Sequence, residues 1–479
     1  MYIGLDLGTS GLKALLIDAE QKVVAESTAP LNVSRPHPGW SEQSPADWLT
    51  ATSAAMEGLA AQAPLGQVKA IGLSGQMHGA TLLDAAQDVL RPCMLWNDTR
   101  AHAEAAALDA DPLWRQVTGN IVFPGFTAPK VMWVAKNEPK IFEKTSKILL
   151  PKDYLRLWLT GEAVSEMSDA AGTSWLDTGA RDWSDALLAA SGLTRDHMPR
   201  LVEGSAVSGT LRRELADRWG LPADVIVAGG GGDNAASAVG VGVVRAGDAF
   251  ISLGTSGVLF AASDAYQPDA ATAVHTFCHA LPDTWHQMGV FLAATDALNW
   301  YARLVGSDAA ALTGELGDLR APGRTLFLPY LGGERTPHND AQIRASLTGL
   351  EHATDRAAGT AAVLEGVTFA VRDSYDALAS TGTKFDRLIA VGGGSRSDYW
   401  LAAIATALDM PVQVPVAGDF GGAFGAARLA LMADTGAGTE AAPVPTISKV
   451  IEPVGALTAA FADAHDRYRN TYLALRGLS

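Results

Sequence analysis

Short apolar runs rich in β-branched residues alternate along the chain with longer stretches of helical periodicity. The runs that predict strands lie at residues 2–5, 68–73, 224–228 and 388–391, and each leads into glycine or small polar residues. The patterns that predict helices lie at residues 44–61, 397–408, 421–430 and 457–475. Residues 436–447 are rich in Gly, Ala, Pro and Thr and predict a linker. Strands that alternate with helices indicate an α/β fold.

One short motif occurs twice, at positions separated by about half of the chain. Residues 7–12 (LGTSGL) recur as residues 253–258 (LGTSGV). Each copy lies between two apolar runs and predicts a β-hairpin whose turn offers backbone N–H groups and hydroxyls. The spacing indicates two similar domains that face one cleft, although two unrelated tight turns would leave the same pattern.

Composition and charge narrow the class of protein. A chain of 479 residues predicts two large domains, and 48% hydrophobic residues with 18% charged residues exclude a disordered chain. The formal net charge of −16 argues against a nucleic-acid or anionic-membrane surface, and no apolar run reaches the length of a membrane helix. Two cysteines form neither a disulfide framework nor a zinc cluster. With no leader-like start, the sequence predicts a cytoplasmic protein.

Two common nucleotide-binding motifs are missing from the sequence. It contains no Gly-x4-Gly-Lys-Ser/Thr, which argues against a P-loop NTPase. It also has no Gly-x-Gly-x-x-Gly between a strand and a helix, which argues against a dinucleotide dehydrogenase. Phosphate binding would therefore use the two hairpin turns.

Several segments resemble a known family. Residues 4–13 (GLDLGTSGLK) resemble the first phosphate loop of the actin/hexokinase/sugar-kinase superfamily, and residues 125–134 (GFTAPKVMWV) are similar to the first signature of the FGGY carbohydrate kinases. Within that family the bacterial xylulokinases are most similar at residues 74–79 (SGQMHG), 95–98 (LWND), 231–234 (GGDN) and 333–337 (GERTP). The resemblance runs from residue 1 to about residue 435.

The resemblance implies two ribonuclease-H-like α/β domains that flank a catalytic cleft. Residues 1–245 would form the sugar and phosphate side, residues 246–435 the nucleotide side, and residues 436–479 a linker and a helix that packs back. The implied reaction is ATP-dependent phosphorylation of D-xylulose, with ATP and Mg²⁺ as cofactors. The expected partners are a ketopentose and ATP, without nucleic acid or membrane, and a homodimer stays open.

Two aspartates are candidates for the chemistry. Asp233 follows four glycines at a strand end, where a tight turn can project one carboxylate into a cleft. The resemblance makes Asp233 the base that accepts the proton of the attacking hydroxyl, and helix N-cap is the alternative role. The resemblance also makes Asp6, on a strand that should be buried, the Mg²⁺ ligand through water. Otherwise Asp6 would brace the following turn.

The candidate nucleotide-binding residues lie on three loops. Thr9 and Thr255 could offer hydroxyls to the phosphates, while Gly8 and Gly254 let the backbone approach. The other members of this set are Ser10, Lys13, Gly393 and Gly394. Lys13 could instead be a solvated strand residue, and residues 392–395 (GGGS) resemble the family's adenosine loop.

The candidate sugar-binding residues form two groups, one after a predicted strand end and one that begins with a tryptophan. His78 and Met77 could supply a polar partner and an apolar wall, and the resemblance assigns this pair to the ketose. Trp96, Asn97 and Asp98 form a second candidate wall for the sugar, and Asp233 completes the set. The alternatives are a loop histidine without a ligand and a tryptophan that belongs to the core.

Three other functions compete with a xylulose kinase. Another FGGY kinase, for ribulose, gluconate, glycerol or fuculose, would share the ATP motifs and differ around residues 77–98. An actin-like or chaperone-like ATPase would keep the hairpins without the sugar-binding residues. A silent sugar-binding regulator would bind a ketose without turnover, and the presence of both Asp6 and Asp233 argues against it.

Overall fold

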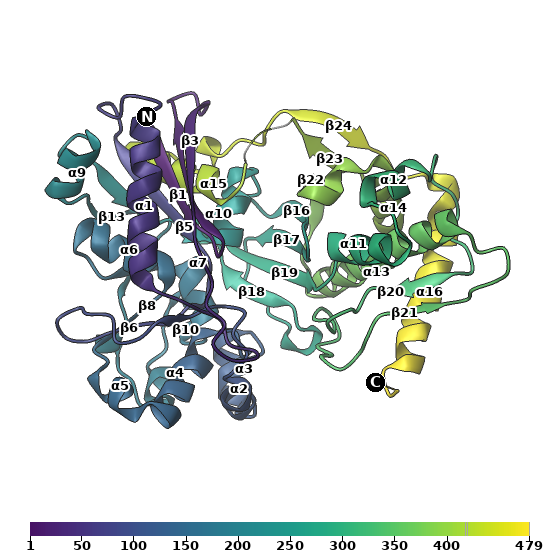
Figure 1. The fold of residues 1–479 in the computed structure, drawn as a ribbon, viewed down its shortest axis with the longest axis horizontal. Coiled ribbons are helices and arrows are strands. Elements are labelled where there is room, and N and C mark those ends of the chain that lie inside the picture. The colour runs from purple at the N-terminus through teal and green to yellow at the C-terminus, as the bar shows by residue number, and fades with distance from the viewer. Residues whose placement is uncertain (417, 419, 479) are drawn as a thin grey trace.

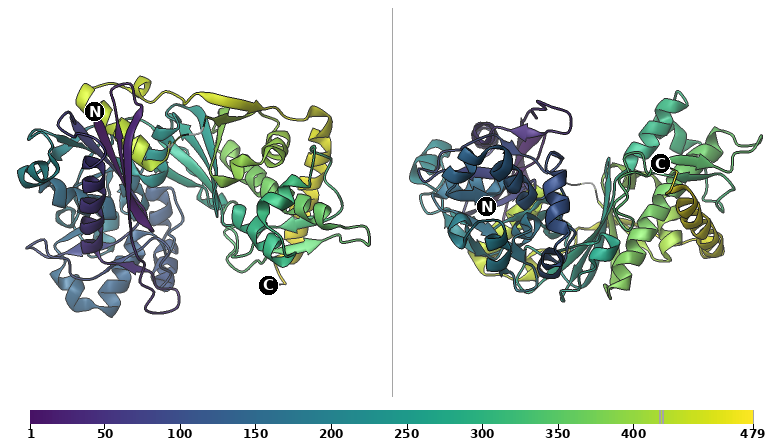
Figure 2. Two further views of the ribbon diagram at one scale, coloured as in Figure 1. Left: turned by 45° about the horizontal axis from the view of Figure 1, so that its top comes forward. Right: turned by 90° about the horizontal axis from the view of Figure 1, so that it is seen from below.

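The computed structural model describes residues 1–416, 418 and 420–478. Figures 1 and 2 show two α/β units side by side along the longest axis, with the C-terminal helix at the end away from the first unit. The first sheet has the order β13-β14-β5-β1-β2-β3. Its strands include β1 (Tyr2–Leu7), β2 (Gly11–Ile17), β3 (Val23–Pro30), β5 (Ala70–Gly75) and β14 (Ile226–Ala228). β1 to β3 form an antiparallel meander, and β5 and β14 run parallel to β1.

The second sheet repeats this topology. Its meander consists of β16 (Gly247–Leu253), β17 (Gly257–Ser263) and β19 (Trp285–Phe291), and its parallel strands are β22 (Phe385–Val391) and β23 (Val412–Pro415). Antiparallel edge strands β13 (Val207–Thr210) and β24 (Ile447–Ile451) extend the two sheets at equivalent places. The two predicted hairpins are confirmed, and the shared strand order confirms two similar α/β domains.

Helices surround both sheets. In the first half of the chain they are α1 (Pro45–Ala60), α2 (His102–Asp109), α3 (Pro112–Thr118), α4 (Thr127–Asn137), α5 (Pro139–Lys144), α6 (Pro151–Thr160), α7 (Met167–Ala170), α8 (Asp185–Ala190), α9 (Arg213–Trp219) and α10 (Asp233–Gly240). In the second half they are α11 (Thr295–Leu304), α12 (Ala309–Gly314), α13 (Arg356–Ser380), α14 (Asp398–Leu408), α15 (Gly422–Thr435) and α16 (Thr458–Leu475). None of the described helices has the length and apolar character needed to cross a membrane.

Helix α15 returns to the first sheet. A Cβ atom on Gly4 would lie 1.7 Å from the carbonyl oxygen of Ala423, and one on Gly72 would lie 1.8 Å from that of Ala426. The backbone of α15 therefore rests directly on β1 and β5, and only glycine fits at these two strand positions. Residues 246–435 are the predicted second domain, and α15 lies in this range although it packs on the first sheet. The domain bounds stay a prediction. The chain passes back to the second unit for β24 and α16.

The predicted linker at residues 436–447 is partly structured. Residues Thr439–Ala441 form a 3₁₀ turn, and β24 begins at Ile447 and pairs with β23. Its sequence, ISKVI, alternates apolar and polar side chains, which is the pattern of an edge strand. The final helix, α16, lies where the sequence predicted it and packs against α13, α14 and β20 (Leu326–Leu328) of the second unit.

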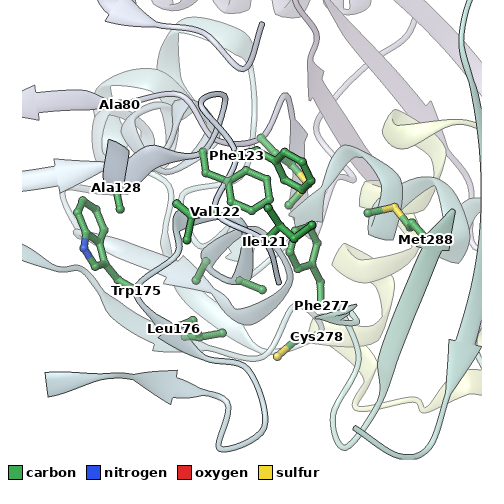
Figure 3. Close-up of a cluster of buried hydrophobic side chains, with 14 of the residues drawn as sticks. Ala80, Ile121, Val122, Phe123, Ala128, Trp175, Leu176, Phe277, Cys278 and Met288 are labelled. Atoms are coloured by element: carbon green, nitrogen blue, oxygen red, sulfur yellow. The ribbon is translucent and has the colours of Figure 1, made fainter. Parts of the chain in front are cut away.

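A buried cluster joins the two units. Figure 3 shows Phe277, Cys278 and Met288, from β18 (His275–Cys278) and β19, in one cluster with Ile121 and Phe123 of the first unit. The side-chain amide of Asn120 pairs with the backbone of Thr276, at 2.9 Å in each direction. Both free cysteines, Cys93 and Cys278, are buried. The second sheet is thus anchored beside the loop that precedes α4.

Candidate active site

Asp6 and Asp233 lie at one edge of the first sheet. Asp6 stands opposite Ser74 in the ladder between β1 and β5, and Ser74 stands opposite Gly231 of β15 (Gly231–Gly232). The Ser74 hydroxyl donates to the Asp6 carboxylate at 2.7 Å. Asp233 follows β15 immediately, so both carboxylates sit at the carboxyl ends of neighbouring parallel strands, where α/β sheets bind ligands.

The environment of Asp233 suits a base. Burial raises the pKa of Asp233 to about 7, and the negative charge of Asp6 adds to this shift. A carboxylate that titrates near neutral pH can take a proton more readily than an ordinary aspartate. Asp233 is the first residue of α10, whose N-cap is Gly232, and its Oδ1 accepts from the backbone N–H of Asn234 at 2.7 Å. Gly232, and not Asp233, thus occupies the N-cap position, and the role of Asp233 as base stays a prediction.

Met77 and His78 lie near the loop that presents Asp233. A Cβ atom on Gly232 would lie 2.9 Å from the Met77 sulfur, which places Met77 against the residue before Asp233. The His78 ring stacks on Phe126 with 4.6 Å between ring centroids, and its Nδ1 is 2.8 Å from the carbonyl oxygen of Gly172.

The hydrogen bond fixes what the ring of His78 can offer. Burial lowers the pKa of His78 to about 3, so the ring is neutral at physiological pH. A carbonyl oxygen can only accept, so Nδ1 carries the proton and donates to Gly172. The other ring nitrogen, Nε2, is then an acceptor for a ligand hydroxyl.

Lys130 was missed as a residue of this site. Its Nζ is buried and donates to the carbonyl oxygens of His78, at 2.8 Å, and Gly125, at 2.6 Å. Burial lowers the pKa of Lys130 to about 7. The lysine ties the His78 loop, which has a left-handed backbone at His78, to the start of α4. Its only sequence signal was its place in the 125–134 signature.

The three residues of the second candidate sugar wall, Trp96, Asn97 and Asp98, lie in different environments in the structure. The indole N–H of Trp96 donates to the Thr9 hydroxyl at 3.0 Å, so this half-exposed ring lies at the first hairpin turn. Asp98 is fully buried, and its carboxylate accepts from the Arg100 guanidinium and from the backbone N–H of Ser41. The prediction that Asp98 contacts the sugar is therefore wrong, because both of its oxygens are occupied by the protein. The buried Oδ1 of Asn97 has no hydrogen-bond partner among the described residues.

The first hairpin turn is braced by glutamines. The Thr9 hydroxyl lies 3.2 Å from the side-chain oxygen of Gln76, and Gln43 donates to the Thr9 carbonyl at 2.7 Å. Gly8 and Thr9 are partly exposed, and Ser10 is exposed at the tip. Lys13 stands opposite Asp6 in the ladder and makes an ion pair of 2.9 Å with Glu26. The pairing with Glu26 supports a structural role for Lys13.

The second hairpin turn, at residues 254–256, lies next to the glycine-rich loop at residues 392–395. Thr255 is exposed, and the Gly254 carbonyl accepts from the backbone N–H of Thr295 at 2.9 Å. β16 and β22 are parallel neighbours, so their carboxyl ends bring residues 254–256 and 392–395 together. A Cβ on Gly393 would meet nothing within 4 Å, whereas one on Gly394 would clash with Leu253. The loop thus has a tightly packed underside and an open, exposed outer side.

Family models match both halves of the chain. Residues 1–240 match the model of the N-terminal domain of the FGGY family of carbohydrate kinases, and residues 249–433 match that of its C-terminal domain. The chain belongs to the FGGY family of carbohydrate kinases. It is similar to the xylulose kinase of Escherichia coli (strain K12), with 52% identity over 90% of each chain.

Solved structures of family members share the whole fold. A "xyloylose kinase" from Brucella ovis is 62% identical, with a TM-score of 0.98 and full coverage of both chains. Xylulose kinase from Rhodospirillum rubrum is 29% identical, with a TM-score of 0.93, and 100% of this chain and 99% of that one are covered. The two-domain FGGY fold and a sugar kinase are confirmed, while the roles of individual residues stay predictions.

Proposed function

We propose that this FGGY kinase transfers the γ-phosphoryl group of ATP to the terminal hydroxyl of D-xylulose. The observation that carries the proposal is the adjacency of Met77 and His78, the candidate sugar residues, to the loop that presents Asp233. A base must lie within hydrogen-bond reach of the hydroxyl that it activates, so the sugar site and the base have to be neighbours. Both the curated relative and the two solved structures reported above carry a xylulose or "xyloylose" kinase name.

The residues divide the reaction between them. Asp233 takes the proton of the attacking hydroxyl, and His78 Nε2 accepts from another hydroxyl of the sugar and fixes its orientation. The turns at Thr9 and Thr255 present N–H groups and hydroxyls to the phosphates, and the open side of Gly393 accommodates the adenosine. Phosphoryl transfer depends mostly on positioning and charge stabilisation, which these loops provide.

Asp6 fits the role of a magnesium ligand. It supplies carboxylate oxygens, which Mg²⁺ prefers, and a cation would relieve its repulsion of Asp233. When bound, Mg²⁺ would neutralise phosphate charge, and Asp6 would hold it directly or through water. ATP and Mg²⁺ are thus the proposed cofactors. The homodimer and the cytoplasmic location stay predictions.

A coupled ADP-release assay over pentoses, pentuloses, gluconate, glycerol and other polyols tests the function. We expect D-xylulose to give the highest kcat/KM. Preference for another ketose or polyol would favour a different FGGY activity. ATP hydrolysis that no sugar stimulates would favour an actin-like ATPase, and xylulose binding without turnover would favour a regulator.

His78→Ala tests the sugar site. The variant loses one acceptor for a sugar hydroxyl, and such a hydrogen bond contributes about 0.5–1.5 kcal/mol, so the KM for D-xylulose should rise about 2- to 12-fold. The KM for ATP should stay nearly unchanged, because the hairpin turns are intact. Steady-state kinetics with each substrate varied in turn measure both values. Equal losses for sugar and ATP would contradict this placement of His78.

A further inference from the structure

The segment Gly333–Pro337 has no part in the mechanism above. Glu334 and Thr336, which flank Arg335 in this segment, are both held in place by hydrogen bonds. The Glu334 carboxylate accepts from the backbone N–H groups of Leu292, at 3.0 Å, and Arg335, at 2.7 Å. Thr336 and Val290 form two hydrogen bonds of 3.0 Å, one through the Thr336 backbone and one through its hydroxyl. Both anchored side chains are buried in the second unit, so the Arg335 side chain between them must leave in another direction.

The guanidinium of Arg335 reaches the first unit. It lies 4.2 Å from the ring centroid of Phe123, on the loop before α4. None of the described residues accepts a hydrogen bond from this guanidinium or forms an ion pair with it. Burial raises the pKa of the adjacent Glu334 to about 8, and the positive charge of Arg335 opposes this rise. Arg335 is partly buried, and its guanidinium has donors that the protein does not use, which points to a ligand that pairs with it.

Arg335 belongs to the wall of the His78 site. Phe123 packs edge-on against Phe126 at 5.5 Å between ring centroids, and Phe126 stacks on His78. Burial holds the pKa of His275 well below its usual value, and the nearby positive charge of Arg335 contributes to this shift. His275 in turn lies 5.8 Å from Phe126. The aromatic side chains thus form a continuous wall between His78, on the first unit, and Arg335, on the second.

We propose that Arg335 is a sugar-binding residue, supplied by the second unit, that donates N–H bonds to the carbonyl and an adjacent hydroxyl oxygen of the ketose. The inference rests on the proposed function and adds a specificity determinant to it. A guanidinium offers several donors in a rigid plane and suits two neighbouring oxygens. His78 Nε2 can only accept in its neutral form, so it would take a hydroxyl and leave the carbonyl to Arg335.

In this arrangement the second unit contacts the sugar directly. His78 and Asp233 belong to the first unit, whereas Arg335 is held by β19 of the second. A ketose bound by all three residues would bridge the units, so sugar affinity and the relative position of the units become linked. A ligand can bias such an equilibrium only through contacts that differ between its states, and the Arg335 contact is one.

The test compares Arg335→Gln with Arg335→Lys and with the control Arg324→Gln. Arg324 belongs to the same unit, and its side chain is 82% exposed. Loss of hydrogen bonds from a charged donor should raise the KM for D-xylulose about 10- to 150-fold in Arg335→Gln, with an intermediate rise in Arg335→Lys. The KM for ATP should change less than about threefold, and Arg324→Gln should match the unaltered enzyme.

Binding of D-xylulose and of xylitol, which lacks the carbonyl, separates recognition from folding. Calorimetric titration should show that Arg335→Gln loses more affinity for D-xylulose than for xylitol, because only the ketose presents the carbonyl acceptor. Equal losses for both ligands, or an unchanged KM for D-xylulose, would overturn the role of Arg335 while leaving the kinase activity intact. An unaltered enzyme that fails to phosphorylate D-xylulose would overturn the proposed function itself. If Arg335→Gln does not fold, Arg335→Lys with the same two ligands decides the question.

Discussion

Asp233→Asn is expected to lower kcat for D-xylulose by at least about 100-fold, because general-base catalysis contributes typically 10²–10⁴-fold. The amide keeps the shape of the side chain and can still accept from the backbone N–H of Asn234, so the loop should keep its conformation. It cannot take the proton of the attacking hydroxyl. Xylulose affinity should change much less than kcat. Near-normal turnover of a folded Asp233→Asn enzyme would show that the base lies elsewhere.

The pH dependence of kcat/KM is a second test of Asp233 as the base. A base works only when it is deprotonated, so kcat/KM should fall as the pH drops through the pKa of Asp233, which burial and Asp6 raise to about 7 and which Mg²⁺ on Asp6 would lower again. Below that value the loss should approach tenfold per pH unit, and Asp233→Asn should abolish this acidic limb. Asp6→Asn is compared with it for the response to Mg²⁺. Its defect should be relieved in part by extra Mg²⁺, whereas that of Asp233→Asn should not.

Lys152→Met is expected to destabilise the protein strongly. The Lys152 ammonium is fully buried and lies 2.7 Å from Asp153, 3.1 Å from Asp169 and 3.3 Å from Glu166. Burial alone would lower the pKa of Lys152, but the three carboxylates raise it above its usual value. Without the lysine the carboxylates lose their central cation, and breaking a buried pair in this way costs about 3–5 kcal/mol.

Thermal unfolding of Lys152→Met and of the control Lys136→Met measures the effect. At about 2–4 °C per kcal/mol for a large domain, Tm should fall by roughly 6–20 °C in Lys152→Met. The Lys136 side chain is 70% exposed and pairs with Glu104 at 3.3 Å, so its loss should change Tm by little. The Ser168 hydroxyl, between Glu166 and Asp169 in sequence, accepts from the backbone N–H of Gly232 at 3.0 Å. The cluster therefore also supports the loop before Asp233. Equal Tm values for Lys152→Met and Lys136→Met would contradict the stabilising role of Lys152.

The sequence predicted the local elements well because each has a local cause. The hairpin turn at residues 7–12 and its copy at 253–258 follow from glycines between apolar runs, and both form as predicted. The helices at 397–408 and 457–475 follow from periodicity and caps. For instance, the Ser397 hydroxyl accepts from the backbone N–H of Trp400, a regular N-cap.

What the sequence could not supply depends on partners distant in the chain. The return of α15 to the first sheet is set by close backbone contact at Gly4 and Gly72, which a helical pattern at residues 421–430 does not reveal. Arg335 reaches the His78 site only through the packing of the two units. Asp98 shows the opposite error, since its partner Arg100 is just two residues away but a carboxylate beside a tryptophan suggested a sugar.

The return of α15 has a consequence for how the protein is made. The first sheet needs α15 to cover the face that carries Gly4 and Gly72, and this helix ends at Thr435. On the ribosome, roughly 190 residues separate the end of the first half from that point, which at about 5–20 residues per second takes roughly 10–40 s. Throughout that interval the face of the first sheet that carries Gly4 and Gly72 lacks its covering helix. The packing of the first sheet is therefore completed late in translation, only after the second unit's sheet has been synthesised up to β23.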